Sequence, residues 1–258
     1  MRLPVPAQGW RGALRASTIS LACLLAALVL ESDLAVRVLV ACEFSGVVAA
    51  AFREKGHGAI SRDLLPSEDE GRFHLQCDVL SVLDKGWDLM IAHPPCTFLC
   101  NSGVKHLYIG GRKENGLDRL RWANMVNAAI FFKALLNAPI PRIAIENPIP
   151  HGWALERIGK DYDDTFQPWQ FWAGEPGKGE VKRTCIWRKN LPALVPTTPN
   201  ETGRIDRIHK MGPSKTRGHD RSVTYPGWAQ AAAEQWGKFK GVADEIEFAQ
   251  RAYQSAHP

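Results

Sequence analysis

The sequence lacks several signatures that would assign it to a common class at once. No two of its six cysteines form a Cys-x-x-Cys pair, and no Cys/His cluster has the spacing of a structural zinc site. It has no Gly-x-Gly-x-x-Gly fingerprint, no internal repeat and no low-complexity tract. These absences argue against a zinc module, a disulfide framework, a phosphate-binding dinucleotide fold and a repeat protein.

Long apolar runs are also scarce. The strongest one, residues 19–30, follows three arginines and resembles the charged and hydrophobic regions of a signal peptide. It is too short for a membrane span, and an acidic stretch leads from it directly into a strand pattern. We therefore expect residues 1–35 to be an N-terminal extension ahead of a natural start near Val36, and the protein to be cytoplasmic, in a bacterial or phage-infected cell. Secretion through this run is the alternative.

Basic residues are present in excess and are unevenly distributed. The formal net charge is +5, and the stretch from Lys178 to Arg221 holds eleven Lys or Arg residues against four acids. Such a stretch is either a solvated basic surface or a contact surface for an anionic partner such as nucleic acid.

Short apolar segments alternate with helical patterns from residue 36 onward. Strands are predicted over 36–41, 58–61, 87–92, 142–146 and 184–187, and a helix over 46–55. Trp122, Met125, Val126, Ala129 and Ile130 have the spacing of one face of a further helix, which we expect to end before Pro139. This order predicts an α/β protein with a mostly parallel sheet and helices on both faces. Ligands bind at the carboxyl ends of the strands in such sheets.

The first three predicted strand ends carry residues suited to a nucleoside. The turn Glu43-Phe44-Ser45-Gly46 opens a helix, and a small-residue turn of this kind lets backbone N–H groups approach a polar ligand. Asp63 stands where a carboxylate could accept hydrogen bonds from a ribose diol. Asp78 and Val79 follow the short segment Leu75-Gln76-Cys77, which we take as a further strand end. They could contact the amino group and ring of an adenine. S-adenosylmethionine has these groups and requires no phosphate site.

The later strand ends carry a thiol, a carboxylate and two cations. The run His93-Pro94-Pro95-Cys96 fixes the backbone just before the thiol, and Glu146-Asn147 ends the next strand. A carboxylate at the end of an apolar strand is costly to bury without a partner, and Arg183 is a possible one. Lys182 and Arg183 precede the last predicted strand.

In this order the motifs resemble those of the DNA cytosine C5-methyltransferases. Pro95-Cys96 matches the nucleophile motif of that family and Glu146-Asn147 its Glu-Asn motif, while Lys182-Arg183 resembles part of its Gln-x-Arg-x-Arg motif. The three cofactor motifs are matched by 44–46, Asp63 and 78–79, and the last motif by 221–228, which returns to the cofactor. The resemblance covers residues 36 to about 237 and is closest to compact phage-type members.

The sequence departs from the family at several positions. Thr97 replaces the usual glutamine, the first turn has one glycine, and Cys185 stands where a second arginine is usual. Only about 33 residues separate Trp187 from Arg221, where the family usually inserts a large recognition domain. The resemblance therefore implies a reduced target-recognition region.

The resemblance implies a Rossmann-like methyltransferase fold and methyl transfer from S-adenosylmethionine to C5 of a flipped cytosine in DNA. Cys96, Glu146 and Arg183 would be catalytic, Pro95, Asn147 and Lys182 would contact the substrate, and Pro94 would join the cofactor residues 43–46, Asp63, Asp78 and Val79. We expect no metal ion, and we expect the protein to be a monomer. The implied division is a catalytic core over 36–177, a basic recognition segment over 178–221 and a closing segment over 222–258.

Three other readings stay open from the sequence. One is a cytosine-hypermodifying enzyme that uses a modified sulfonium donor. Another is an N4 or N6 amino-methyltransferase, although His93 and Cys96 are not the residues that chemistry usually has in this turn. The third is an inactive DNA-binding homologue.

Overall fold

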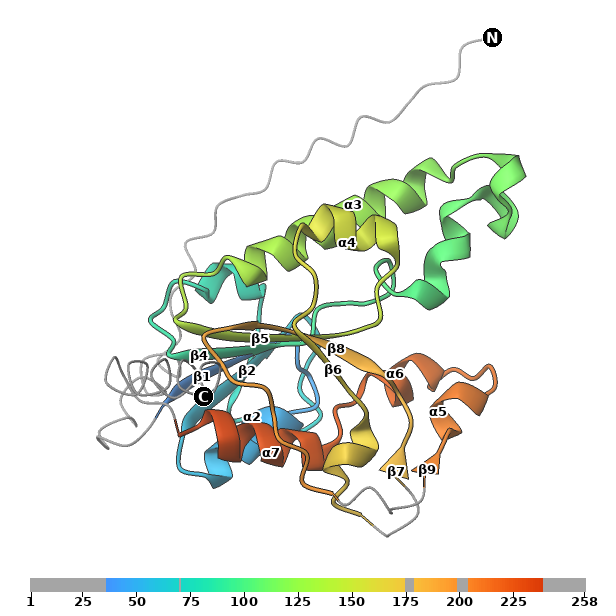
Figure 1. Ribbon diagram of the computed structural model, residues 1–258. Helices are drawn as coiled ribbons and strands as arrows, with labels where there is room; N and C mark the ends of the chain where they lie inside the picture. The colour runs from blue at the N-terminus through green and yellow to red at the C-terminus, as the bar shows by residue number, and fades with distance from the viewer. Residues whose placement is uncertain (1–35, 70, 175–178, 199–203, 239–258) are drawn as a thin grey trace, which may run out of the picture. The chain divides into compact units, whose positions relative to one another are not determined.

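The computed structural model describes residues 36–69, 71–174, 179–198 and 204–238 (Figure 1). The chain divides into two units, 1–31 and 32–258, and all described residues belong to the second. The predicted N-terminal extension and residues 239–258 of the predicted closing segment lie outside the described residues. No described helix has the length and apolar character needed to cross a membrane.

A seven-stranded sheet forms the centre of the described unit, in the order β3-β2-β1-β4-β5-β8-β6. The strands are β1 (Arg37–Ala41), β2 (Gly58–Asp63), β3 (His74–Gln76), β4 (Leu89–Ala92), β5 (Arg142–Pro148), β6 (Asp164–Phe166) and β8 (Thr184–Lys189). The first five strands are mutually parallel, and β8 runs antiparallel to both β5 and β6. The predicted mostly parallel α/β sheet is confirmed.

Helices cover both faces of this sheet (Figure 1). One face carries α2 (Val47–Glu54) and α7 (Pro226–Trp236), and the other carries α3 (Arg119–Leu136) and α4 (Gly152–Ile158). The remaining short elements are α5 (Arg207–Lys210), α6 (Arg217–Ser222) and a two-stranded sheet of β7 (Gly179–Glu180) and β9 (Arg204–Ile205). Helix α3 ends before Pro139, as predicted.

Alternation along the strands divides the core into two layers. Val38 and Val40 of β1 face the α2/α7 layer, whereas Leu39 and Ala41 face the α3/α4 layer. The same alternation holds in β4, β5 and β8, because successive strand residues point to opposite faces of a sheet. It therefore fixes the face on which each residue at a strand end lies.

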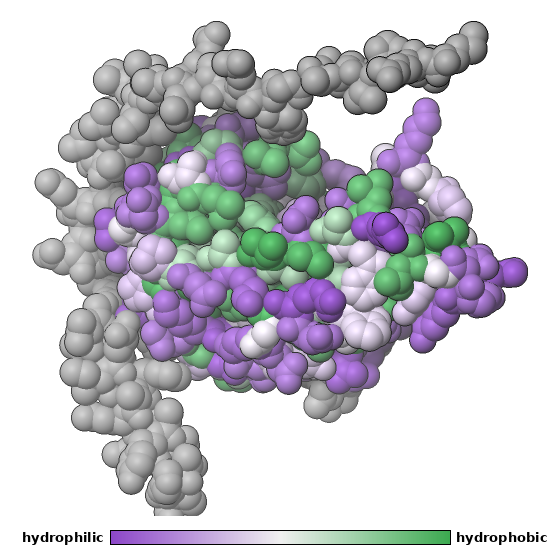
Figure 2. Space-filling view, turned by 90° about the horizontal axis from the view of Figure 1, so that it is seen from above, coloured by the Kyte–Doolittle hydropathy of each residue, from purple (hydrophilic) through white to green (hydrophobic). Residues whose placement is uncertain are grey.

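The predicted face of α3 is offset from the observed one. Met125 and Ala129 are buried together with Phe132 and Leu135, but Ile130 is 60% exposed. The helix has apolar residues around its whole circumference, so spacing alone could not select the buried side. Figure 2 looks onto the outer side of the α3/α4 layer and shows hydrophobic surface among hydrophilic residues.

The basic stretch is divided between several structural contexts. Strand β8 lies inside the main sheet between β5 and β6, so the described residues of 178–221 belong to more than one structural element. Lys189 ends β8 opposite the start of β5, away from Glu146. Its ammonium group donates to the carbonyls of Ala138 and Ile140. Arg188 pairs with Asp164.

Candidate active site

The turn after β1 begins at the point where the strand order reverses between β1 and β4, the usual ligand crevice of such sheets. Cys42 and Gly46 have positive φ angles of 58° and 71°. The positive φ of Gly46 favours glycine, and an added Cβ would also lie 2.6 Å from a carboxylate oxygen of Asp69, which would have to move. Residues 43–46 thus form a tight turn that leads directly into the first turn of α2.

Glu43 is turned toward the helix that follows it. Its side chain is buried and accepts hydrogen bonds from the backbone N–H groups of Val48 at 2.6 Å and Ala49 at 3.2 Å. Burial raises the pKa of this carboxyl, and nearby His93 acts in the opposite direction. In the described structure Glu43 therefore organises the start of α2.

The two predicted nucleoside-contacting acids come together around Cys42. Burial and the charges of Asp63 and Asp78 raise the pKa of the Cys42 thiol to about 12. One oxygen of Asp63 accepts from the backbone of Leu65, and one oxygen of Asp78 accepts from that of Leu80. The recorded bonds use one oxygen of each carboxylate, and Val79 beside Asp78 is buried. The remaining carboxylate oxygens can accept hydrogen bonds from hydroxyl and amino groups, which S-adenosylmethionine carries.

The Pro94-Pro95-Cys96 turn is fixed from two other elements. The buried Asn147 side chain of β5 donates to the Pro94 carbonyl at 2.8 Å. Arg121 of α3 donates to the Thr97 carbonyl at 2.7 Å and lies over the Phe98 ring. Asn147 therefore positions the loop that carries the thiol, and Cys96 is partly accessible there.

Glu146 lies on the α2/α7 side of the sheet and pairs with His93. The His93 Nδ1 atom is 3.1 Å from a Glu146 carboxylate oxygen. Burial alone would raise the pKa of Glu146, but the hydrogen bond with His93 and the charges of Lys182 and His93 hold it below its usual value. Glu146 thus has two basic side chains beside it. Lys182 was a predicted site residue, and His93 was not a predicted partner.

The Cys96 thiol interacts electrostatically with Glu146, with Lys182 and with the thiol of Cys100. Contact with the Cys100 thiol, burial and the charge of Glu146 raise the pKa of Cys96, whereas Lys182 lowers it. Cys100 follows one turn later, and its backbone N–H donates to the Cys96 carbonyl at 2.9 Å. The interaction with Cys96 and the donors Ser102 and Gly103 lower the pKa of Cys100.

A small cavity lies beside Glu146. The space between its walls is about 290 Å³, a volume that includes open solvent at its mouth. Its walls come from β5, β6, the start of β8 and the connection from α6 to α7, and its lining residues are Glu146, Phe166, Lys182, Thr184, Ser222, Val223, Thr224, Tyr225 and Trp228. The predicted closing motif therefore lines the Glu146 cavity.

The same closing region also reaches the cofactor turn. The His219 ring of α6 is 5.7 Å from the Phe44 ring, and its Nε2 atom contacts Glu68 in the loop after β2. The hydrogen bonds with Glu68 and Asp220 raise the pKa of His219. Helix α6 thus bridges the two halves of the candidate site.

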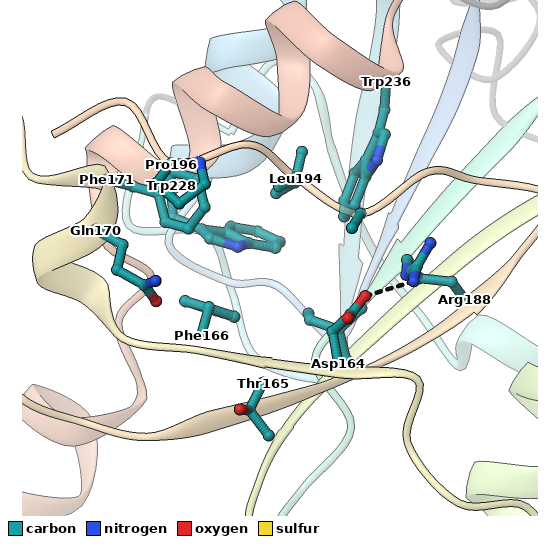
Figure 3. Close-up of a pocket in the computed structure, with 12 residues that line it drawn as sticks. Asp164, Thr165, Phe166, Gln170, Phe171, Arg188, Leu194, Pro196, Trp228 and Trp236 are labelled. Carbon is teal, nitrogen blue, oxygen red and sulfur yellow. Dashed lines mark ion pairs between the residues drawn. The ribbon is translucent and has the colours of Figure 1, made fainter. Parts of the chain in front are cut away.

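A second cavity lies behind the first and shares part of its wall (Figure 3). Phe166 and Trp228 line both cavities and stack at a ring distance of 5.5 Å. Arg188 and Asp164 pair at one end of the second cavity, and Trp236 closes another side. The aromatic pair therefore stands between the two cavities.

Among the described residues, Arg183 does not form the ion pair with Glu146 that the sequence offered as one possibility. It is exposed, and the recorded ion-pair partner of Glu146 is His93. Sequence reasoning missed His93 and Trp228, whose rings are 5.9 Å apart. The alternation of β4 and β5 was a usable signal, because it places His93 and Glu146 on the same face.

No metal cluster is found among the described residues, and their five cysteines are free. No protein-family model matches the chain, and no curated protein matches its sequence. A solved E. coli structure described as a candidate DNA modification methyltransferase encoded within a prophage is similar at a TM-score of 0.36 and 13% identity. The match covers 60% of this chain and 46% of that one, so this chain corresponds to less than half of that protein.

Proposed function

We propose that this protein transfers a methyl group from S-adenosylmethionine to C5 of cytosine in DNA, through a covalent adduct with Cys96. The observation that carries the proposal is the convergence of Cys96, Glu146 and Lys182 at neighbouring strand ends. Glu146 and Lys182 line one small cavity, and Cys96 interacts electrostatically with both. A thiol, a carboxylate and a cation in this arrangement suit addition to a flat, weakly electrophilic ring.

Each group has a defined part in this chemistry. The Cys96 thiolate adds to C6 of a cytosine flipped out of the duplex, and the electron pair displaced from the ring is taken up at N3. Glu146 delivers a proton to N3, so negative charge does not accumulate on the ring, and recovers it when C5 attacks the methyl group. Bound S-adenosylmethionine supplies that electrophilic methyl group. Loss of the C5 proton and of Cys96 then releases 5-methylcytosine.

The proposed cofactor and DNA contacts follow from the same arrangement. In this proposal, residues 44–46, Asp63, Asp78, Val79 and Pro94 contact the cofactor, and Glu43 holds the start of α2 beside it. Pro95, Asn147 and Lys182 shape the base site, and exposed Arg183 contacts a phosphate or the edge of the base. Other exposed basic residues of 178–221 contact the DNA backbone.

The test is methyl transfer by Cys96→Ser. We expect the variant to bind S-adenosylmethionine normally but to transfer no label to DNA, since serine is a far poorer nucleophile than a thiolate. Cys100→Ser is the matched control on the same turn, and it should keep methyl transfer. Undiminished transfer by Cys96→Ser would contradict the proposal.

Two further measurements identify the product and the intermediate. Nucleoside mass spectrometry should find 5-methyldeoxycytidine; an N4- or N6-methylated nucleoside would indicate an amino-methyltransferase, and a heavier C5 adduct a modified donor. DNA containing 5-fluorocytosine should trap the protein covalently, because fluorine cannot leave C5 as a cation. Peptide mapping should place the adduct on Cys96.

A further inference from the structure

His93 occupies a position that the sheet register determines. Its backbone N–H donates to the carbonyl of Ala41 at 2.9 Å, so it extends the pairing of β4 with β1. Ala92 pairs with Ile145, which puts His93 directly beside Glu146 on the neighbouring strand. Both side chains lie on the α2/α7 side of the sheet because they continue the alternation of Ile91 and Ala144.

The contact between the two side chains is sheltered from water. Their exposed fractions are 11% for His93 and 18% for Glu146, and the Trp228 ring stands edge-on to the imidazole. The other ring nitrogen of His93, Nε2, is buried and has no hydrogen-bond partner among the described residues. The imidazole is therefore committed to Glu146 through Nδ1.

Several ionisable groups surround this pair. Glu43 faces it from the turn after β1, Lys182 from the start of β8, and Cys96 from its own loop. Tyr225, at the start of α7, is also within electrostatic range of Glu146. Two carboxylates and one lysine thus share the site with His93, and only an imidazole among these groups ordinarily exchanges its proton near neutral pH.

We propose that His93 is a positioning residue that orients Glu146 and supplies the proton that Glu146 passes to N3 of the cytosine. This assignment rests on the proposed function. As the Cys96 Sγ–C6 bond forms, the Nδ1 proton of His93 moves to the Glu146 carboxylate, and the carboxyl group so formed passes a proton to N3. When C5 bonds to the methyl group, N3 returns its proton to Glu146 and His93 is reprotonated, so the relay consumes no proton.

The test compares His93→Asn with the wild-type protein across pH. An asparagine amide can donate to Glu146 from the position of Nδ1, but it has no proton to transfer. We expect His93→Asn to bind S-adenosylmethionine and DNA normally and to transfer methyl groups at least about 100-fold more slowly, the lower end of general acid–base effects. The wild-type rate should fall on the alkaline side, and this alkaline decline should be absent in the variant.

The outcomes separate the possible roles of His93. If His93→Asn transfers methyl groups more slowly by the same factor at every pH and keeps the alkaline decline, the role of His93 is purely structural and the assignment is overturned. An unchanged methyl-transfer rate would overturn it as well. Should His93→Asn fold poorly by circular dichroism, His93→Gln provides the same comparison. If the wild-type protein forms no 5-methyldeoxycytidine, the proposed function fails and the assignment of His93 fails with it.

Discussion

At the scale of single residues, the candidate site contains more interacting groups than the matched motifs predict. The Cys96 thiol has Cys100 one turn away and Glu146 across the site, and both disfavour its thiolate. Lys182 opposes them. The reactivity of Cys96 therefore depends on neighbours whose positions are set by the fold.

Cys100 provides a direct test of this balance. We expect Cys100→Ala to lower the pKa of Cys96, because the neighbouring thiol is the largest cause of its elevation. Alkylation of Cys96 by iodoacetamide, followed by peptide mass spectrometry from pH 6 to 10, should reach half-maximal rate at a lower pH in the variant. Cys77→Ala is the control and should leave the Cys96 profile in place. A profile that moves to higher pH in Cys100→Ala would contradict the prediction.

At the scale of elements, α7 holds the wall of the candidate site in place. Gly227, in its first turn, lies so close to the 171–173 backbone that an added Cβ would fall 1.6 Å from the Phe171 carbonyl oxygen. Trp228, the next residue, packs against Phe166, His93 and Trp236. A glycine is required here because backbone, not a flexible side chain, occupies the neighbouring space.

We expect Gly227→Ala to lower the free energy of unfolding by about 3 kcal/mol, the upper part of the usual range for overpacking. Gly218→Ala in α6 is the matched control, since its added Cβ meets no atom within 4 Å and alanine favours helix by about 1 kcal/mol. Urea unfolding followed by circular dichroism measures both. Equal stability of the two variants would show that the backbone at 171–173 yields without cost.

At the scale of the whole molecule, the net charge of +5 is less informative than the location of the charges. Lys189 and Arg188 lie at the end of β8 and make structural contacts with other segments. Lys182 and Arg183 precede the start of β8, which lies beside the end of β5 near Glu146. A basic stretch continuous in sequence is thus divided by the fold into structural and site-facing residues.

We expect Arg183→Ala to weaken DNA binding and to reduce the slope of log K against log salt by about 0.9, as for one lost phosphate contact. Lys85→Ala is the control, because Lys85 precedes β4 and so lies at the opposite end of the sheet. Fluorescence anisotropy at several salt concentrations provides both slopes. Equal slopes for Arg183→Ala and the wild type would place the phosphate contacts elsewhere.

Sequence pattern was sufficient for the fold class and for the order of the site residues along the chain. Buried strands such as β1 and β5 are short and strongly apolar, and their carboxyl ends must meet at one edge of a parallel sheet. The sequence alone therefore predicts that Asp63, Asp78 and Cys96 lie at one edge of the sheet. The buried face of α3 could not be assigned in the same way, because its sequence is apolar on every side.

What only the tertiary structure decided was which side chains pair across strands. The partner of Glu146 is His93 and not Arg183, because β4 lies beside β5 in register and brings an imidazole to 3.1 Å, while Arg183 points to solvent. Likewise the turn at Gly46 brings the first turn of α2 next to Glu43. The Glu43 carboxylate can therefore accept hydrogen bonds from the backbone N–H groups there. Spacing along one chain carries the periodicity of each element, but pairings between elements depend on register and sheet order.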